Sequence, residues 1–292
     1  MDNAIRVAEQ FYSLQGEGRY VGVPSVFLRL FGCNFRCKNF NRDPHEVIDG
    51  PNPDVAEVIR NLPTFFRDEE DIRDLPIVTS GCDSYAAIYP EFKEFSPIVA
   101  LEDLASSLIA LTPDKGFHKS LHMVVTGGEP LLWQKRFGLL GYSLFKRNCD
   151  VRIPYTFETN GTQIIDGLAF DELNQFGHIH FSVSPKLSVS GEKRSEAILG
   201  DVVYEYMDYG IVDLKFVVDS QDSVDEVEDV LDNEYKMIYN DPRFGHVYLM
   251  PEGGTVEEYS KNRRLIADLV LARGYRYSPR LQNDIYKNSW GT

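Results

Sequence analysis

The sequence predicts an α/β protein built as a partial, open barrel of the (β/α)6 type. Apolar, β-branched runs that end in polar turns alternate with stretches of helical periodicity, which indicates a parallel sheet joined by right-handed crossovers. About six or seven such units can be recognised, fewer than the eight of a closed barrel. With 292 residues and 43% hydrophobic content, the chain can bury a full core, and we expect a single domain over residues 1–292.

The expected elements follow one another in order. Strands are predicted at residues 25–31, 123–126, 153–157, 178–183, 212–218 and 246–250, and a last strand begins near Tyr275. Helices are predicted at 101–111, 131–147, 223–238 and 257–273, the last ending at Gly274, a typical helix-terminating residue. A shorter helix is predicted near 55–62, within a segment rich in Pro, Asp, Asn and Glu.

Composition excludes several classes of protein. A formal net charge of −15 argues against direct nucleic-acid binding, which depends on clustered Lys and Arg. The N-terminus does not resemble a signal peptide, and no apolar run reaches the length of a membrane span, so a cytoplasmic protein without membrane association is expected. Four cysteines in a chain of this length suggest metal or redox chemistry in a reducing compartment rather than a disulfide framework.

The first candidate site is a pair of cysteines that follows the strand at 25–31. Cys33 and Cys37, just after Gly32, place two soft thiolates on a tight loop at the carboxyl end of a strand, where a metal or cluster can be held and still be reached by substrate. A four-iron cluster that binds a small molecule needs three thiolates and leaves one iron open, so a third ligand must come from elsewhere.

Polar turns follow the other predicted strands. Gly127-Gly128-Glu129-Pro130 comes after the strand at 123–126, Glu158-Thr159-Asn160-Gly161 after the next, and Ser184-Pro185-Lys186 after the one at 178–183. Met250-Pro251 ends a later strand in the same way. Because the carboxyl ends of barrel strands share one mouth, these turns and Cys33 are expected to converge there.

These motifs resemble a known family. The stretches Leu14-Gln15-Gly16-Glu17-Gly18, Phe27-Leu28-Arg29-Leu30, Gly32 to Cys37 and Thr126 to Pro130 are similar to radical S-adenosylmethionine (SAM) enzymes of the 7-carboxy-7-deazaguanine synthase type. In that family the cysteine loop runs Cys-x-x-x-Cys-x-x-Cys-Asp-Thr. Here Phe40 stands where the third cysteine is expected.

A close match to the missing part occurs further along, at Cys82-Asp83-Ser84. The resemblance therefore makes residues 38–81 an insertion between the second and third cluster cysteines. Roughly 42 of these residues are extra, and such a length is tolerable because loop-closure entropy grows only logarithmically. His45 or an acidic residue within the segment is the competing third ligand.

The resemblance also implies cofactors and residue roles. A [4Fe-4S] cluster is expected on Cys33, Cys37 and Cys82, and Mg²⁺ on Ser84. S-adenosyl-L-methionine is expected at Asp83, Gly127, Gly128, Glu129, Glu158, Asn160, Ser184, Pro185 and Lys186. Substrate is expected at Leu14, Gln15, Gly16, Glu17, Arg29 and Thr126, with Arg29 paired to the substrate carboxylate. No catalytic side chain is assigned, since the cofactor carries the difficult chemistry.

The implied reaction is radical SAM conversion of 6-carboxy-5,6,7,8-tetrahydropterin to 7-carboxy-7-deazaguanine with loss of ammonia, a lyase step of queuosine-type deazapurine biosynthesis. The implied partners are the pterin substrate, an electron donor such as flavodoxin or ferredoxin, and a second copy in a homodimer. The C-terminal residues 280–292 are expected to close over the substrate, and Cys149 is interpreted as a structural or incidental thiol.

Two alternatives remain at this stage. Another radical SAM enzyme, such as an activase-like protein, would share the Thr126 to Pro130 turn but would not need the Leu14 to Gly18 turn or Ser84. A clusterless binding protein could have kept the fold after losing the third cysteine, and Cys82 would then lie far from Cys33 and Cys37.

Overall fold

The computed structural model describes residues 3–65, 72–118, 121–148 and 151–292. Its centre is one nine-stranded sheet with the order β3-β1-β2-β4-β5-β6-β7-β8-β9. The strands are β1 (Ala4–Leu14), β2 (Pro24–Leu30), β3 (Ile98–Ala100), β4 (His122–Gly127), β5 (Ile153–Thr159), β6 (Gly177–Val183), β7 (Ile211–Val218), β8 (Val247–Pro251) and β9 (Arg276–Tyr277).

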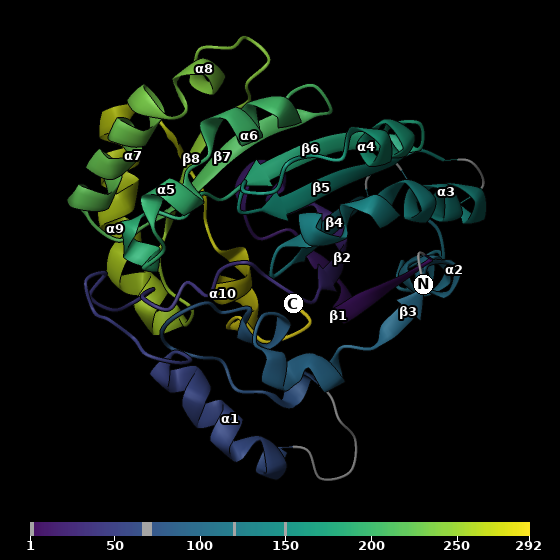
Figure 1. Cartoon of the computed structure of the whole chain (residues 1–292), viewed down its shortest axis with the longest axis horizontal. Helices are drawn as coiled ribbons and strands as arrows, with labels where there is room; N and C mark the ends of the chain where they lie inside the picture. Colours follow the sequence, from purple (N-terminus) through teal and green to yellow (C-terminus); the bar gives the residue numbers. More distant parts are fainter. Residues whose placement is uncertain (1–2, 66–71, 119–120, 149–150) are drawn as a thin grey trace.

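From β2 onward the neighbouring strands are parallel, and β3 and β9 form the two edges. The sheet is therefore a curved, open partial barrel, and the predicted fold class is confirmed. Helices surround its outer side, as Figure 1 shows for α3, α4, α6, α7 and α9. The helices are α1 (Pro53–Phe65), α2 (Leu101–Ala110), α3 (Phe137–Arg147), α4 (Gly167–Asn174), α5 (Arg194–Ala197), α6 (Gly200–Tyr206), α7 (Gln221–Asn233), α8 (Lys236–Tyr239), α9 (Val256–Arg273) and α10 (Leu281–Tyr286).

Local sequence explains several boundaries. Helix α7 begins with a capping box, in which the Ser220 and Ser223 side chains each accept a backbone N–H group from the other's end of the turn. Helix α9 begins at Thr255, whose hydroxyl accepts from the Glu258 N–H group, and ends at Gly274 in the left-handed conformation (φ 75°). The predicted end of this helix at Gly274 is therefore confirmed.

The structure differs from the sequence-based expectation at several places. Strand β1 was not predicted, and it pairs antiparallel with β2, so the parallel sheet carries an antiparallel hairpin at one edge. The predicted helix 131–147 is a 3-10 segment (Pro130–Arg136) followed by α3, and the predicted helix 223–238 is divided into α7 and α8. Helices α4, α5 and α6 were not predicted because they are short and weakly amphipathic.

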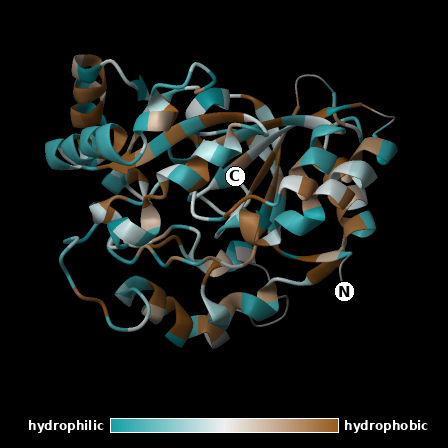
Figure 2. Cartoon of the chain, turned by 45° about the horizontal axis from the view of Figure 1, so that its top comes forward, coloured by the Kyte–Doolittle hydropathy of each residue, from teal (hydrophilic) through white to brown (hydrophobic). Residues whose placement is uncertain are grey.

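The main hydrophobic core lies between the sheet and the helices packed on its outer face. Figure 2 shows apolar colour on the strands at the centre and hydrophilic colour over much of the surrounding helices. A second, smaller core joins residues of the 38–81 segment, such as Val55, Val58 and Val78, to Ala8 and to residues 85–92. No helix formed by the residues that the structure describes is long and apolar enough to cross a membrane.

Candidate active site

The carboxyl ends of the parallel strands surround a cavity of about 240 Å³. The sequence-predicted turns after β1, β2, β4, β5 and β6 all contribute to its wall, together with residues 77–84 and the C-terminal residues 288–292. Of the predicted site residues, those that line it are Leu14, Gln15, Gly16, Glu17, Arg29, Cys33, Cys37, Cys82, Asp83, Ser84, Thr126, Gly127, Gly128, Glu158, Asn160, Ser184 and Lys186. The expected convergence at one mouth is therefore observed.

Three thiols lie on this wall. Cys33, Cys37 and Cys82 are all unpaired, and Cys33 and Cys82 pack against the small apolar cluster that contains Cys37. Burial raises the pKa of Cys33 to about 11, that of Cys82 to about 12 and that of Cys37 well above its usual value. Cys33 adds to the increase in the pKa of Cys37 and Cys82. Without a metal they are protonated, and a coordinated metal would deprotonate them outright.

Within the described parts of the chain no three His, Cys, Asp or Glu side chains meet closely enough to hold a single metal ion. The three cysteines gathered at this cluster supply the set of thiolates that a four-iron cluster with one open iron needs. The loop offers further support to such a group, since the Phe35 N–H group donates to Cys33 Sγ (3.4 Å) and the Asn160 Nδ2 lies 4.0 Å from the same sulfur.

The distant Cys82 reaches the other two through a closed neck at the base of the 38–81 segment. The Gly81 N–H group donates to the Phe40 carbonyl (2.8 Å), and Asn41 Nδ2 donates to the Thr79 carbonyl (3.0 Å). Asn52 Nδ2 spans the neck, donating to the Lys38 carbonyl (2.8 Å) and to Ser80 Oγ (3.3 Å). Residues 40 and 81 are therefore adjacent at the two ends of the segment, and Cys82 lies next to Phe40 although 41 residues separate them in the sequence.

The double glycine after β4 is required by packing against the cysteine loop. A Cβ atom at Gly128 would lie 2.3 Å from the Gly32 carbonyl oxygen and 2.8 Å from Cys33 Cβ. At Gly127, where φ is +146°, a Cβ would lie 2.2 Å from the Leu30 carbonyl oxygen. The Glu129 N–H group also donates to the Gly32 carbonyl (2.8 Å). The glycines therefore bring the backbone of this turn directly against the loop that carries Cys33.

The carboxylate of Glu129 does not reach the cavity. It is completely buried and accepts the Leu131 N–H group (3.0 Å), the Thr159 hydroxyl (2.8 Å) and the Asn160 N–H group (2.7 Å). Burial raises its pKa, against the effect of these bonds. Its side chain ties two of the predicted turns together. Pro185 is likewise buried behind the wall.

Arg29 faces the cavity but already has partners. Its Nε donates to Glu9 Oε2 (3.1 Å) and its Nη1 to Ser84 Oγ (2.7 Å), and the guanidinium lies 5.9 Å from the centre of the Trp290 ring. Glu9 is a buried carboxylate of β1, and pairing with it would give Arg29 a structural role even if no ligand were bound.

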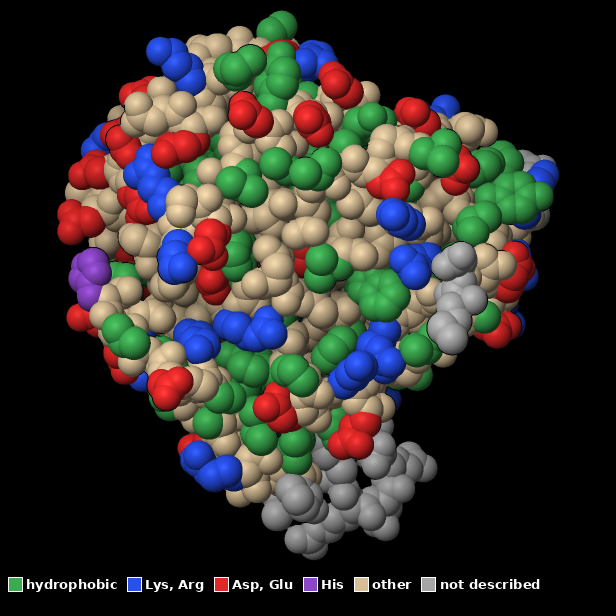
Figure 3. Space-filling view, in the orientation of Figure 1, with side chains coloured by type: hydrophobic (Ala, Val, Ile, Leu, Met, Phe, Trp, Pro, Cys, Tyr) green, Lys and Arg blue, Asp and Glu red, His purple; other side chains and the backbone are tan. Residues whose placement is uncertain are grey.

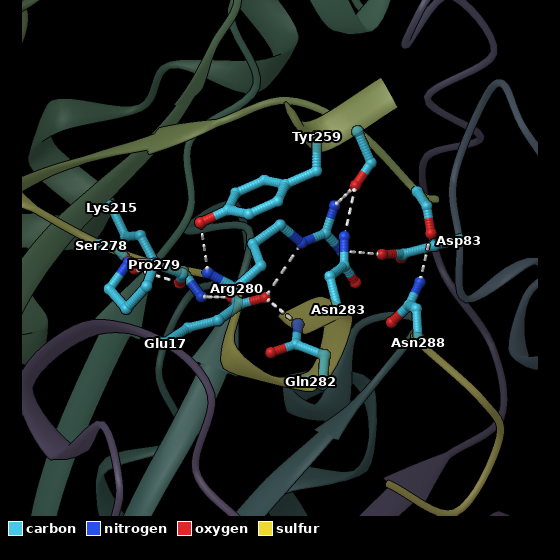
Figure 4. Close-up of polar contacts among 12 residues, drawn as sticks. Glu17, Asp83, Lys215, Tyr259, Ser278, Pro279, Arg280, Gln282, Asn283 and Asn288 are labelled. Carbon is cyan, nitrogen blue, oxygen red and sulfur yellow. Dashed lines mark hydrogen bonds and ion pairs between the residues drawn. The ribbon is translucent and has the colours of Figure 1, made fainter. Parts of the chain in front are cut away.

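A buried polar network lies beside the Leu14 to Gly18 turn (Figure 4). Glu17 contacts Lys215 Nζ from β7, lies 3.5 Å from Arg280 Nε, and accepts from Gln282 Nε2 (2.7 Å). Burial raises the pKa of Glu17, but Lys215 and Arg280 outweigh burial and lower it. Glu17 is therefore ionised although it is enclosed.

The remaining predicted residues are held as follows. Gln15 Nε2 donates to Glu158 Oε1 (3.1 Å), and Lys186 Nζ donates to the Ser184 carbonyl (2.9 Å) and hydroxyl (3.0 Å). Gly16 has no room for a side chain, since a Cβ there would lie 1.8 Å from Gln282 Oε1. His45, the alternative third ligand, is exposed and lies away from the cavity wall. Cys149 lies outside the described residues.

Sequence reasoning missed several cavity residues, among them Lys215, Glu252 and Arg280. Lys215 points inward from the middle of β7 and is 4% exposed, so a charged residue between apolar neighbours of a buried strand was the available signal. Arg280 belongs to the C-terminal segment that was expected to close over substrate, and residues 288–292 of that segment do line the cavity. The clusterless alternative required Cys82 to lie far from Cys33 and Cys37, and it lies on the same wall.

Comparison with known proteins agrees with this geometry. No protein-family model matches the chain. Among solved structures, QueE from Escherichia coli superposes with a TM-score of 0.51 at 20% identity, over 94% of this chain and 93% of that one. That similarity supports the fold. The open parallel sheet and its cysteine-lined mouth are those expected of an enzyme of the radical SAM type.

Curated relatives give the particular family. Proteins from Halobacterium salinarum (29% identity, covering 98% of this chain and 92% of the relative), Pyrobaculum aerophilum (29%, 98% and 97%) and Rhodopirellula baltica (28%, 100% and 90%) are all named 7-carboxy-7-deazaguanine synthase. The chain is related to the 7-carboxy-7-deazaguanine synthases over almost its whole length, and the predicted resemblance is confirmed.

Proposed function

We propose that this enzyme converts 6-carboxy-5,6,7,8-tetrahydropterin to 7-carboxy-7-deazaguanine with loss of ammonia, in queuosine-type deazapurine biosynthesis. The observation that carries the proposal is the cavity itself, where three separate thiols share one wall with the Leu14 to Gly18 turn, Arg29 and Ser84. An activase-like enzyme would need the thiols but not these other residues. The names of the curated relatives favour the same reaction.

The residues fit a [4Fe-4S] cluster on Cys33, Cys37 and Cys82, with SAM beside Gly128, Asn160 and Lys186. Together these groups would supply the one-electron chemistry that removes a hydrogen atom from the substrate. Lys186 lowers the pKa of all three thiols, so its positive charge would favour their thiolate forms. Ser84 is proposed to hold Mg²⁺ through its hydroxyl oxygen, a suitable hard ligand.

The chain's own residues would bind and orient the pterin. Arg29, which lines the cavity, would pair its guanidinium with the substrate carboxylate. Glu17 and Lys215, which line the cavity, would offer a buried acceptor and a donor to the flat polar ring. Trp290, at the end of the chain, would exclude water on the side of Arg29, since its ring lies beside the guanidinium.

The partners are part of the same proposal. An electron donor such as flavodoxin or ferredoxin is required, and Figure 3 shows Lys and Arg side chains gathered in a band across the lower half of the face that carries the C-terminus, although the chain is acidic overall. Such a band would complement an acidic electron carrier. We further propose a cytoplasmic homodimer, in line with the expectation from sequence.

The test is the iron and sulfide content and the electron paramagnetic resonance (EPR) spectrum of anaerobically reconstituted, reduced protein. We expect a four-iron signal that changes on addition of SAM in the wild type and in Cys149→Ala, and its loss in Cys82→Ala. Turnover of the pterin, followed by mass spectrometry of the deazaguanine product, then tests the substrate. A cluster that survives Cys82→Ala, or a wild type without a cluster, would refute the proposed site.

A further inference from the structure

We propose that Arg280 is a positioning residue that joins the loop of the third cysteine, Cys82, to the Leu14 to Gly18 turn, so that these two parts of the cavity wall are ordered together. That these two segments serve catalysis rests on the proposed function, whereas the contacts of Arg280 with them are observed. Arg280 stands directly before α10 and is 7% exposed, and Figure 4 shows its guanidinium at the centre of the polar network.

Three different segments meet on this one side chain. Nη2 donates to Asp83 Oδ2, directly after Cys82, and Nη1 donates to the Gly253 carbonyl after β8. Nε lies 3.5 Å from Glu17 Oε1 in the Leu14 to Gly18 turn. The backbone is fixed as well, because the Arg280 N–H group donates to the Tyr259 hydroxyl (3.3 Å). The backbone of Arg280 is therefore held in place, and its planar guanidinium can bond groups on different sides of the cavity mouth.

The third-cysteine loop needs such a contact. In a short, contiguous motif the chain itself would fix Cys82 near Cys37, but here 44 residues separate them. The neck at residues 38–41 and 79–81 holds the chain before Cys82. After Cys82, Asp83 contacts Arg280 and Ser84 contacts Arg29. Cys82 is thus anchored on both sides, and Arg280 provides one of the two later anchors.

The contact with Glu17 has a different consequence. Lys215 and Arg280 both offset the charge of Glu17, but of the two Arg280 also contacts Asp83. What Arg280 alone provides is a link between Glu17 and Asp83, which lie 66 positions apart in the sequence. A lysine at position 280 would keep the charge but could not present the planar pair of Nη donors that bonds Asp83 and the Gly253 carbonyl at once.

The experiment compares wild type with Arg280→Gln and Arg280→Lys. Arg276→Gln is the matched control, because Arg276 precedes it on the same segment and contacts the Tyr248 ring and hydroxyl away from the cavity. The first readout is the SAM concentration needed to change the EPR signal of the reduced protein without substrate. We expect an increase of about 10- to 100-fold in both Arg280 variants, as for other side chains that orient metal-site ligands, and none in Arg276→Gln.

The second readout is hydrogen exchange of the backbone in residues 14–18 and 79–84, which requires no cluster. We expect faster exchange in both segments for both Arg280 variants. Increased exchange in only one segment, or wild-type behaviour of Arg280→Lys, would overturn the inference. If the wild type forms no cluster, the proposed function fails, while the exchange measurement still decides whether Arg280 joins the two segments. Circular dichroism identifies an unfolded variant, and Arg280→Lys then supplies the decision.

Discussion

Glu252 makes the folding stability of this enzyme depend on pH in a direction opposite to that of most carboxylates. The residue follows β8, is 5% exposed and lines the cavity. Its carboxylate accepts the Asn41 N–H group at the neck of the 38–81 segment. Burial raises its pKa to about 7 from the usual 4.5, and Asp219 and Glu258 add to the increase, against smaller opposing effects of Asn41 and Arg280.

The sign follows from the raised value. Because the folded state binds this proton more tightly than the unfolded state, the stabilisation is complete below pH 4.5 and is lost as the pH rises through about 7. The difference between a pKa of 4.5 and one of about 7 corresponds to roughly 3 kcal/mol of stability in total, and most of it is lost between about pH 5 and pH 8. Glu252→Gln keeps an acceptor for the Asn41 N–H group and removes the titration.

The assay is urea unfolding of wild type and Glu252→Gln at pH 5 and at pH 8. Relative to wild type, the variant is expected to gain about 2–3 kcal/mol on going from pH 5 to pH 8. Glu257→Gln, an exposed carboxylate on α9, is the control and should show no such gain. An equal difference between Glu252→Gln and wild type at both pH values would refute the assignment of a buried, protonated carboxyl group.

Two further predictions concern the cavity wall. Gly128→Ala places a Cβ against the Gly32 carbonyl and Cys33, so it should lower the free energy of unfolding by about 1–3 kcal/mol and reduce the iron retained after reconstitution. Gly116→Ala, whose Cβ would meet only a 3.3 Å contact, is the control and should do neither. Normal iron content in Gly128→Ala would contradict the close packing of the two loops. Lys215→Met leaves Glu17 with a weaker counter-charge and should cost about 3 kcal/mol in unfolding free energy. Adding Glu17→Gln should recover most of that loss, and a double variant no more stable than Lys215→Met would show that the pair is not the cause.

The sequence predicted the parallel strands and their polar turns because buried β-branched runs and Gly-rich turns are local signals. It did not predict β1, whose polar residues Arg6, Glu9 and Gln10 interrupt the apolar pattern although the strand is well paired. Lys215 was missed for a related reason, since its charge points into the barrel rather than to solvent. Arg280 lies in the segment that was expected to close over the substrate, but its contacts could not be predicted, because they depend on segments that only the tertiary structure brings together.

The third thiol shows a different limit. The residues around it were recognised by likeness to a contiguous motif, while the way they come together depends on a few backbone contacts at the neck. That closure could not be deduced from residue types.

The neck has a consequence for how such sites can diverge. Since the Phe40 carbonyl and the Gly81 N–H group are already bonded at 2.8 Å, the two ends of the 38–81 segment stay together whatever the length of chain between them. A ligand-bearing loop can therefore be opened there and filled with a folded appendage, here α1, whose Val55 and Val58 pack with Ala8 and residues 85–92, without moving the thiols. Spacing along the chain then ceases to report spacing in the site, and searches built on fixed intervals between cysteines would pass over proteins of this kind.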